Sequence, residues 1–149
     1  TNIFPAAKVE RKKDIMQIMA AHSIPYAATA TIAYPDDLMR KVRKAKEIKG
    51  FRFLHILTPC VTGWKFPANL TVEVSRLAVE TKIFPLFEVE NGTNFTLSKI
   101  FESRPVEAYL GIQRRFQHLT SQQIAGIQSE ADRKWRRLEW LADYKDNGK

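Results

Sequence analysis

The chain has 149 residues, of which 44% are hydrophobic and 27% are charged, a balance typical of one globular domain and not of a disordered or fibrous chain. Its formal net charge of +8 would suit a nucleic-acid partner, but the sequence contains no zinc-finger spacing, basic zipper or aromatic RNA-binding signature, so we expect none. We also expect no membrane contact, because no run of 18 apolar residues occurs, and a cytoplasmic location, because a single cysteine cannot form an internal disulfide.

The first part of the chain alternates between segments typical of helices and of strands. Apolar residues spaced along one face predict a helix over 12–21, and the small and β-branched residues of 26–33 predict a buried strand. Pro35, followed by two acidic residues, predicts the start of a second helix. The inner face of that helix is expected to carry three apolar residues, Leu38, Val42 and Ala45.

The same alternation continues through the middle of the chain. The next predicted strand covers 51–57, a third helix runs over 70–82, and a third strand covers 83–89. Asn91-Gly92 is a strong turn signal, from which 94–97 could return as a short hairpin strand. Helices that alternate with strands in this way predict an α/β fold with a mostly parallel sheet and helices on both of its faces.

From Arg104 onward the alternation stops. The segment 105–118 is predicted to be a polar helix, and 120–143 a longer helix with an apolar stripe. The stripe consists of Ile124, Ile127, Ala131, Trp135 and Leu138. We therefore divide the chain into an α/β part, 1–104, and a helical tail, 105–149, which we expect to pack across the domain or onto another subunit.

The single cysteine, Cys60, follows the predicted strand 51–57, at the end of a sheet where open parallel sheets bind their ligands. The residues alone leave three interpretations open. Cys60 could be a buried free thiol that acts as a small hydrophobic group, or a nucleophile with His55 as its base. It could also be one ligand of a metal or cluster, whose other ligands would come from elsewhere because the chain holds no second thiol.

The other candidate side chains have ordinary explanations beside functional ones. Glu88 and Glu90 could form a carboxylate pair near a strand end, but a solvated strand edge explains them better. His22 is expected at a helix end, where histidines cap carbonyl groups, and His118 on a polar helix. The sequence contains neither G-x-G-x-x-G nor a phosphate loop, so it predicts no phosphate cradle of these kinds.

Two long segments resemble the β subunit of pyruvate:ferredoxin oxidoreductase and of related 2-oxoacid oxidoreductases. They read KKDIMQIMAAHSIPYAATATIAYPDDLMRKVRKAKEIKGFRFLHILTPCVTGW and LAVETKIFPLFEVENG, and the resemblance runs in order over 4–92. The family's β subunit is about twice as long, and this chain is similar to its second half. We therefore expect a fragment, or one piece of a split or cleaved subunit. Ser23, Ala7 and Val61 depart from residues frequent in the family.

The resemblance implies half of a thiamine diphosphate-binding domain and places Cys60 at the family's fourth cluster cysteine. It implies oxidative decarboxylation of a 2-oxoacid, with pyruvate favoured, in which coenzyme A takes part and [4Fe-4S] clusters pass electrons to ferredoxin. Thiamine diphosphate, Mg²⁺ and the [4Fe-4S] cluster would be shared with residues outside this chain, so the chain alone would lack a complete active site. The implied partners are the rest of the β subunit, other oxidoreductase subunits, ferredoxin and coenzyme A.

A function of another class is also open. The tail carries Trp135, Trp140 and six basic residues between Arg114 and Arg137, and could bind a partner subunit or an acidic electron carrier. The chain would then be a non-catalytic docking and assembly module.

Overall fold

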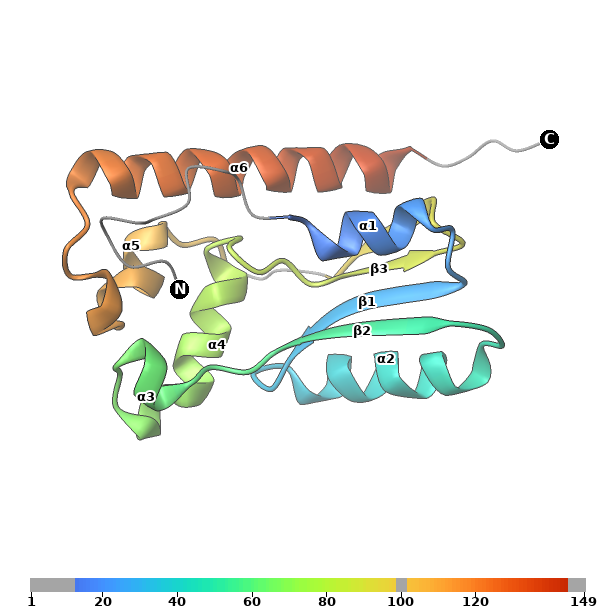
Figure 1. The fold of residues 1–149 in the computed structure, drawn as a ribbon, viewed down its shortest axis with the longest axis horizontal. Helices are drawn as coiled ribbons and strands as arrows, with labels where there is room; N and C mark the ends of the chain where they lie inside the picture. The colour runs from blue at the N-terminus through green and yellow to red at the C-terminus, as the bar shows by residue number, and fades with distance from the viewer. Residues whose placement is uncertain (1–12, 99–101, 145–149) are drawn as a thin grey trace.

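A four-stranded sheet organises the part of the chain that the computed structural model describes, residues 13–98 and 102–144 (Figure 1). Its strands, in the spatial order β2-β1-β3-β4, are β2 Arg52–Leu57, β1 Tyr26–Thr31, β3 Phe87–Glu90 and β4 Asn94–Leu97. The helices are α1 Ile15–Ala21, α2 Pro35–Glu47, α3 Val61–Trp64, α4 Thr71–Glu80, α5 Val106–Gly111 and α6 Ser121–Asp143, with short 3₁₀ turns η1 Ala68–Leu70 and η2 Arg114–Phe116.

The α/β class and the helices on both faces of the sheet are confirmed, but the third strand differs from the expectation of a mostly parallel sheet. Among the described strands, β1 and β2 are parallel, whereas β3 is antiparallel to both β1 and β4. The chain enters β3 beside Ala28 and leaves it beside Tyr26. This is because the segment that contains α4 does not return to the end of the sheet at which β1 begins. Strand β3 therefore has to run back along β1.

Strand β3 is also shorter than predicted, because of a proline. The predicted strand 83–89 begins only at Phe87, because Pro85 has no N–H to donate to a ladder. The Thr29 side chain replaces the ladder there: its Oγ1 donates to the carbonyl of Pro85 and accepts from the N–H of Phe87, both over 2.8 Å. The turn expected at Asn91-Gly92 is confirmed, since both residues have positive φ angles and lead into β4.

Helices cover the sheet on both sides. Helix α2 packs under β1 and β2 through a small cluster of Tyr26, Ala28, Ala45, Ile48 and Leu54. On the opposite face, α1 and the far part of α6 close a second cluster, whose buried members include Met16, Ala20, Ala27, Val89, Phe95 and Leu138. Figure 1 shows α1 and α6 on one side of the strands and α2 on the other.

The helical tail belongs to the same folded body. Val106, Tyr109 and Leu110 of α5 pack with Val74, Leu77 and Ala78 of α4 and with Ala131 of α6, in a third apolar cluster beyond the end of the sheet. Of the two places expected for the tail, the described residues therefore occupy the first, across the domain. Packing onto another subunit stays a prediction. Within residues 13–98 and 102–144, no helix has both the length and the apolar character needed to cross a membrane.

Candidate functional site at the end of strand β2

Cys60 lies in an exposed position just after β2, so the interpretation as a buried thiol is wrong. The buried Pro59 anchors the loop before it, and the segment 61–64 forms the single helical turn α3. Cys60 caps this turn: its Sγ accepts a hydrogen bond from the backbone N–H of Gly63 over 3.3 Å. A Cβ at residue 63 would lie 3.2 Å from the same sulfur, so glycine leaves room for the thiol.

A guanidinium group lies near this thiol. The Arg115 guanidinium carbon stacks 4.0 Å from the ring centre of Trp64 and 4.4 Å from that of Phe116, and its Nε donates to Gln113 over 2.9 Å. Burial lowers the pKa of Arg115, an effect that the nearby Tyr109 and Cys60 oppose. A cation held in this place suits a sulfur that carries negative charge, as a metal-bound thiolate does.

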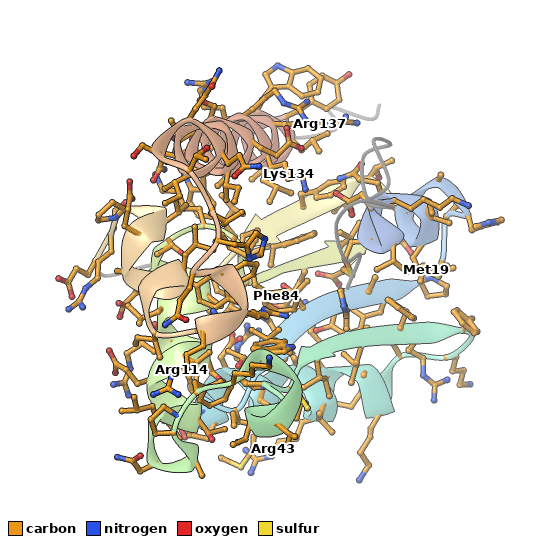
Figure 2. All side chains as sticks on the ribbon, turned by 60° about the vertical axis from the view of Figure 1, so that its left-hand side comes forward. Met19, Arg43, Phe84, Arg114, Lys134 and Arg137 are labelled. Atoms are coloured by element: carbon orange, nitrogen blue, oxygen red, sulfur yellow. The ribbon has the colours of Figure 1, made fainter. Side chains whose placement is uncertain are left out.

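His55 does not form a nucleophile pair with Cys60 in this structure. Its ring packs edge-on against Phe84, 5.2 Å between ring centres, and lies 6.4 Å from the ring of Phe53 (Phe84 is labelled in Figure 2). Among the residues that the structure describes, no hydrogen bond joins the imidazole to the thiol. The geometry that a Cys/His hydrolase requires is therefore not formed.

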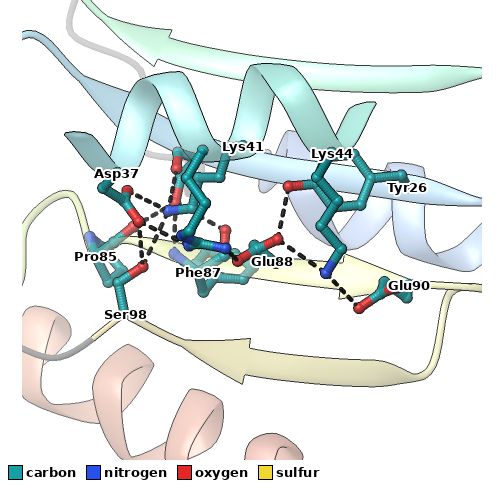
Figure 3. A network of polar contacts seen from close by, with 11 residues as sticks. Tyr26, Asp37, Lys41, Lys44, Pro85, Phe87, Glu88, Glu90 and Ser98 are labelled. Atoms are coloured by element: carbon teal, nitrogen blue, oxygen red, sulfur yellow. Dashed lines mark hydrogen bonds and ion pairs between the residues drawn. The ribbon is translucent and has the colours of Figure 1, made fainter. Parts of the chain in front are cut away.

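The carboxylates expected at a solvated strand edge lie instead in an ionic network between α2 and β3 (Figure 3). Glu88 is buried and accepts from the Tyr26 hydroxyl over 2.7 Å, from Arg40 over 2.6 Å and from Lys44 over 3.2 Å. Burial acts to raise the pKa of Glu88, but these three donors together lower it. Glu90 pairs with Lys44 over 2.7 Å. The fold thus holds Glu88 as an ion and pairs Glu90 with Lys44.

A buried lysine completes this network and was not expected from the sequence. Lys41 is fully buried, and its Nζ donates to Asp37 over 2.6 Å, to the carbonyl of Thr29 over 2.8 Å and to Ser98 over 3.0 Å. Burial lowers the pKa of Lys41, although Asp37 opposes the shift. These bonds tie α2 to β1 and to the residue that follows β4. The spacing of Asp37 and Lys41, four apart on one helix, was the available signal.

The remaining histidines take no part in these groups. His22 caps α1 with its backbone N–H, as expected for a helix end, and the exposed His118 follows η2 instead of lying on a helix.

Two hollows lie on the surface of the described residues. His118 borders an open groove of about 980 Å³ between α5 and α6, which Lys82, Arg115 and Lys134 also line. A smaller hollow of about 370 Å³ beside α3 is lined in part by Lys65 and Arg114. In the described part of the chain, no three His, Cys, Asp or Glu side chains gather closely enough to hold a metal ion.

Comparison with known proteins supplies the family. No family model matches the chain. It is 52% identical over 127 residues to pyruvate synthase subunit PorB of Methanocaldococcus jannaschii, a match that covers 85% of this chain and 43% of that subunit. It is 45% identical over 135 residues to ketoisovalerate oxidoreductase subunit VorB of Pyrococcus abyssi, covering 89% and 43%, and 44% identical over 141 residues to PorB of Thermotoga maritima, covering 91% and 44%.

The match has the same extent in all three relatives. It takes in most of this chain, so the resemblance that the sequence segments indicated is confirmed, but the chain spans less than half the length of the relatives it matches. The chain therefore belongs to the family of the PorB and VorB oxidoreductase subunits and corresponds to a C-terminal part of them.

Proposed function

We propose that the chain is part of a 2-oxoacid:ferredoxin oxidoreductase, to which it contributes Cys60 as one of four ligands of a [4Fe-4S] cluster. Pyruvate and ketoisovalerate, which the names of the relatives contain, are both 2-oxoacids, and this supports the substrate class, with pyruvate favoured. The observation that carries the proposal is the exposed thiol at the carboxyl end of a parallel strand, in a chain 52% identical to an oxidoreductase subunit.

The surroundings of Cys60 fit a cluster ligand. A ligand sulfur has to be accessible, fixed by its backbone and supported by hydrogen-bond donors. Cys60 is exposed, the α3 turn fixes its backbone, and the N–H of Gly63 already points at the sulfur. Arg115, which stacks on Trp64 at the end of the same turn, adds positive charge on this part of the surface. The other three thiolates have to come from outside this chain, which contains one cysteine.

The cluster, when bound, supplies one-electron transfer, and in the proposed reaction the electrons pass on to ferredoxin. With the cluster bound, Cys60 would hold one of its irons, and the Gly63 N–H and the charge of Arg115, which stacks on Trp64, would support the ligand sulfur. We assign no residue of this chain to thiamine diphosphate, Mg²⁺ or coenzyme A. Those groups of the proposed enzyme would be held mainly by the rest of the subunit and by its partner subunits.

The test is a pair of substitutions in the complete subunit. Cys60→Ala is expected to lower the iron content by the share of one cluster, to remove the matching low-temperature EPR signal of the reduced protein, and to slow ferredoxin reduction. Thr58→Ala is the matched control, because Thr58 is exposed in the same loop and carries no sulfur. Full iron content with normal ferredoxin reduction in Cys60→Ala would overturn the assignment.

The docking alternative draws on a different surface. Trp140 and Tyr144, both 63% exposed, stack at the end of α6 with ring centres 5.7 Å apart, an apolar pair open to a partner. The same iron measurement distinguishes the two functions. A module that docks without supplying a ligand would leave the iron content unchanged when Cys60 is replaced.

A further inference from the structure

Strand β2 is built like a core strand but is exposed. All six residues of its neighbour β1 are buried, whereas no residue of β2 is, although five of the six in the segment RFLHIL are apolar or aromatic. Ile56 is 43% exposed, and Phe51, just before the strand, is 61% exposed. Strands that run parallel to a neighbour are normally covered on both faces, so this exposure needs an explanation.

The free edge of β2 also lacks the features that protect natural edges. In the described part of the chain, β2 pairs with β1 along one edge, and no strand pairs with the other. Edge strands are usually protected by charged residues, prolines or bulges. The one charge in β2 is Arg52 at its first position, no proline interrupts it, and its register with β1 is continuous. Its outward N–H and C=O groups are therefore ready to pair with another strand.

The aromatic side chains on one face of β2 are also incompletely covered. His55, Phe53 and Phe84 pack together on the face that carries α1, and all three are only half-buried. On the other face, Ile56 extends beyond the cover that α2 provides. Both faces of β2 thus offer apolar surface next to its free edge, and burying such surface is worth about 25 cal/mol per Å².

We propose that the free edge of β2 pairs with a strand from the part of the subunit that this chain does not span. The match covers 43% of the PorB subunit of M. jannaschii, so more than half of that relative lies outside the match and can supply both a strand and the elements that cover Ile56 and Phe84. The pairing continues the sheet beyond β2 and joins the two parts of the subunit through one core. It is independent of whether Cys60 binds a cluster.

A second copy of this chain is a poorer occupant of the edge. The formal net charge is +8, so two copies repel each other as they approach. The basic side chains labelled in Figure 2 come from α2, η2 and α6, so the positive charge is spread over several elements and cannot easily be turned away from a partner copy. A strand from a different segment need not be positively charged, so this repulsion need not oppose its binding.

The test compares backbone amide exchange in this chain alone and in a complex. The chain is co-expressed with the segment of M. jannaschii PorB that precedes the matched part, and purified as a complex. Amides of β2 that do not bond to β1 are expected to exchange at least about 100-fold more slowly in the complex, while those of β1 change little. Equal exchange of these β2 amides in both samples would overturn the proposal, as would their protection in a dimer of this chain alone.

A matched pair of substitutions locates the contact. Ile56→Glu should abolish co-purification of the two parts, whereas Val72→Glu should not, because Val72 is a similar β-branched residue, 47% exposed, on α4 away from the edge. Both side chains are already largely in water, so each variant alone should keep the circular dichroism spectrum of the parent chain. Co-purification of the Ile56→Glu chain at the parent yield would contradict the proposal.

Discussion

The two sides of β1 differ in how far the chain finishes its own structure. On the β3 side, the charges that enter the interior meet partners from α2, and every buried side-chain nitrogen or oxygen of the described residues has a hydrogen-bond partner. On the β2 side, apolar side chains and a backbone edge stay exposed, and the one thiol lies in the open. The β3 side is therefore self-sufficient, because its buried polar groups are paired within the chain. The β2 side leaves apolar side chains and backbone groups that another segment could cover.

The contrast separates residues that stabilise this chain from residues that are available to bind a partner. A buried ionic network has to be satisfied within the chain, because an unpaired charge in the interior costs several kcal/mol. An apolar edge can stay exposed at a smaller cost in free energy, since single apolar side chains are common on protein surfaces. Substitutions on the β3 side should therefore change the stability of this chain, and those on the β2 side should mainly change what it binds.

The largest effect is expected at Lys41. Lys41→Ala removes the buried cation and leaves Asp37, the carbonyl of Thr29 and Ser98 without their shared donor, so the free energy of unfolding should fall by about 3–5 kcal/mol. Urea unfolding followed by circular dichroism measures this. Lys46→Ala, an exposed position on the same helix, should change stability by less than about 0.5 kcal/mol. Equal effects at the two lysines would mean that the network contributes no stability.

A smaller effect, and one that depends on pH, is expected at Glu88. Its pKa in the folded chain lies below the ordinary value of 4.5, so the ionised carboxylate stabilises the fold above that value. This contribution is lost as the pH falls from the ordinary value through the lowered one, where the carboxylate takes up a proton. The difference in unfolding free energy between the parent chain and Glu88→Gln should therefore be large at neutral pH and shrink in acid.

The control for this pH dependence is an exposed ion pair. Glu73 lies 3.5 Å from Arg76 on α4, and both side chains are more than a third exposed. Glu73→Gln should lower the unfolding free energy by less than about 0.5 kcal/mol at neutral pH and in acid alike. A constant difference between the parent chain and Glu88→Gln across the acid range would show that Glu88 is not held as an ion.

Local patterns in the sequence located the elements but could not orient all of them. The helix that starts at Pro35, the β2 strand and the hairpin at Asn91-Gly92 follow from signals carried by neighbouring residues. The direction of β3 depends on where α4 delivers the chain, which no local pattern records. The division at residue 104 followed a change in composition, while the tail packs against residues far earlier in the chain.

The inner face of α2 shows why patterns fail at polar positions. The expected apolar face included Val42, which is 37% exposed, while Ala45 and Lys41 are buried. Lysine counts as a surface residue in any hydrophobic pattern. Its burial becomes possible only because Thr29 and Ser98, from other segments, meet Asp37 of the same helix around its Nζ. The position of Cys60 beyond a strand was predictable in the same local way, but the approach of Arg115 to it was not.

The smallest effect on stability is expected at Cys60 in this chain by itself. The thiol is exposed and makes one weak hydrogen bond, with the N–H of Gly63, at the start of a single helical turn. Cys60→Ala should therefore change the unfolding free energy by less than about 1 kcal/mol, far less than Lys41→Ala. The same exposure predicts that iodoacetamide alkylates the parent chain completely without denaturant. A thiol that reacts only after unfolding, or a Cys60→Ala chain that fails to fold, would place Cys60 with the self-sufficient side of the molecule. Rapid alkylation with unchanged folding would leave the thiol as a group that the chain carries for use outside its own core, like the edge of β2 beside it.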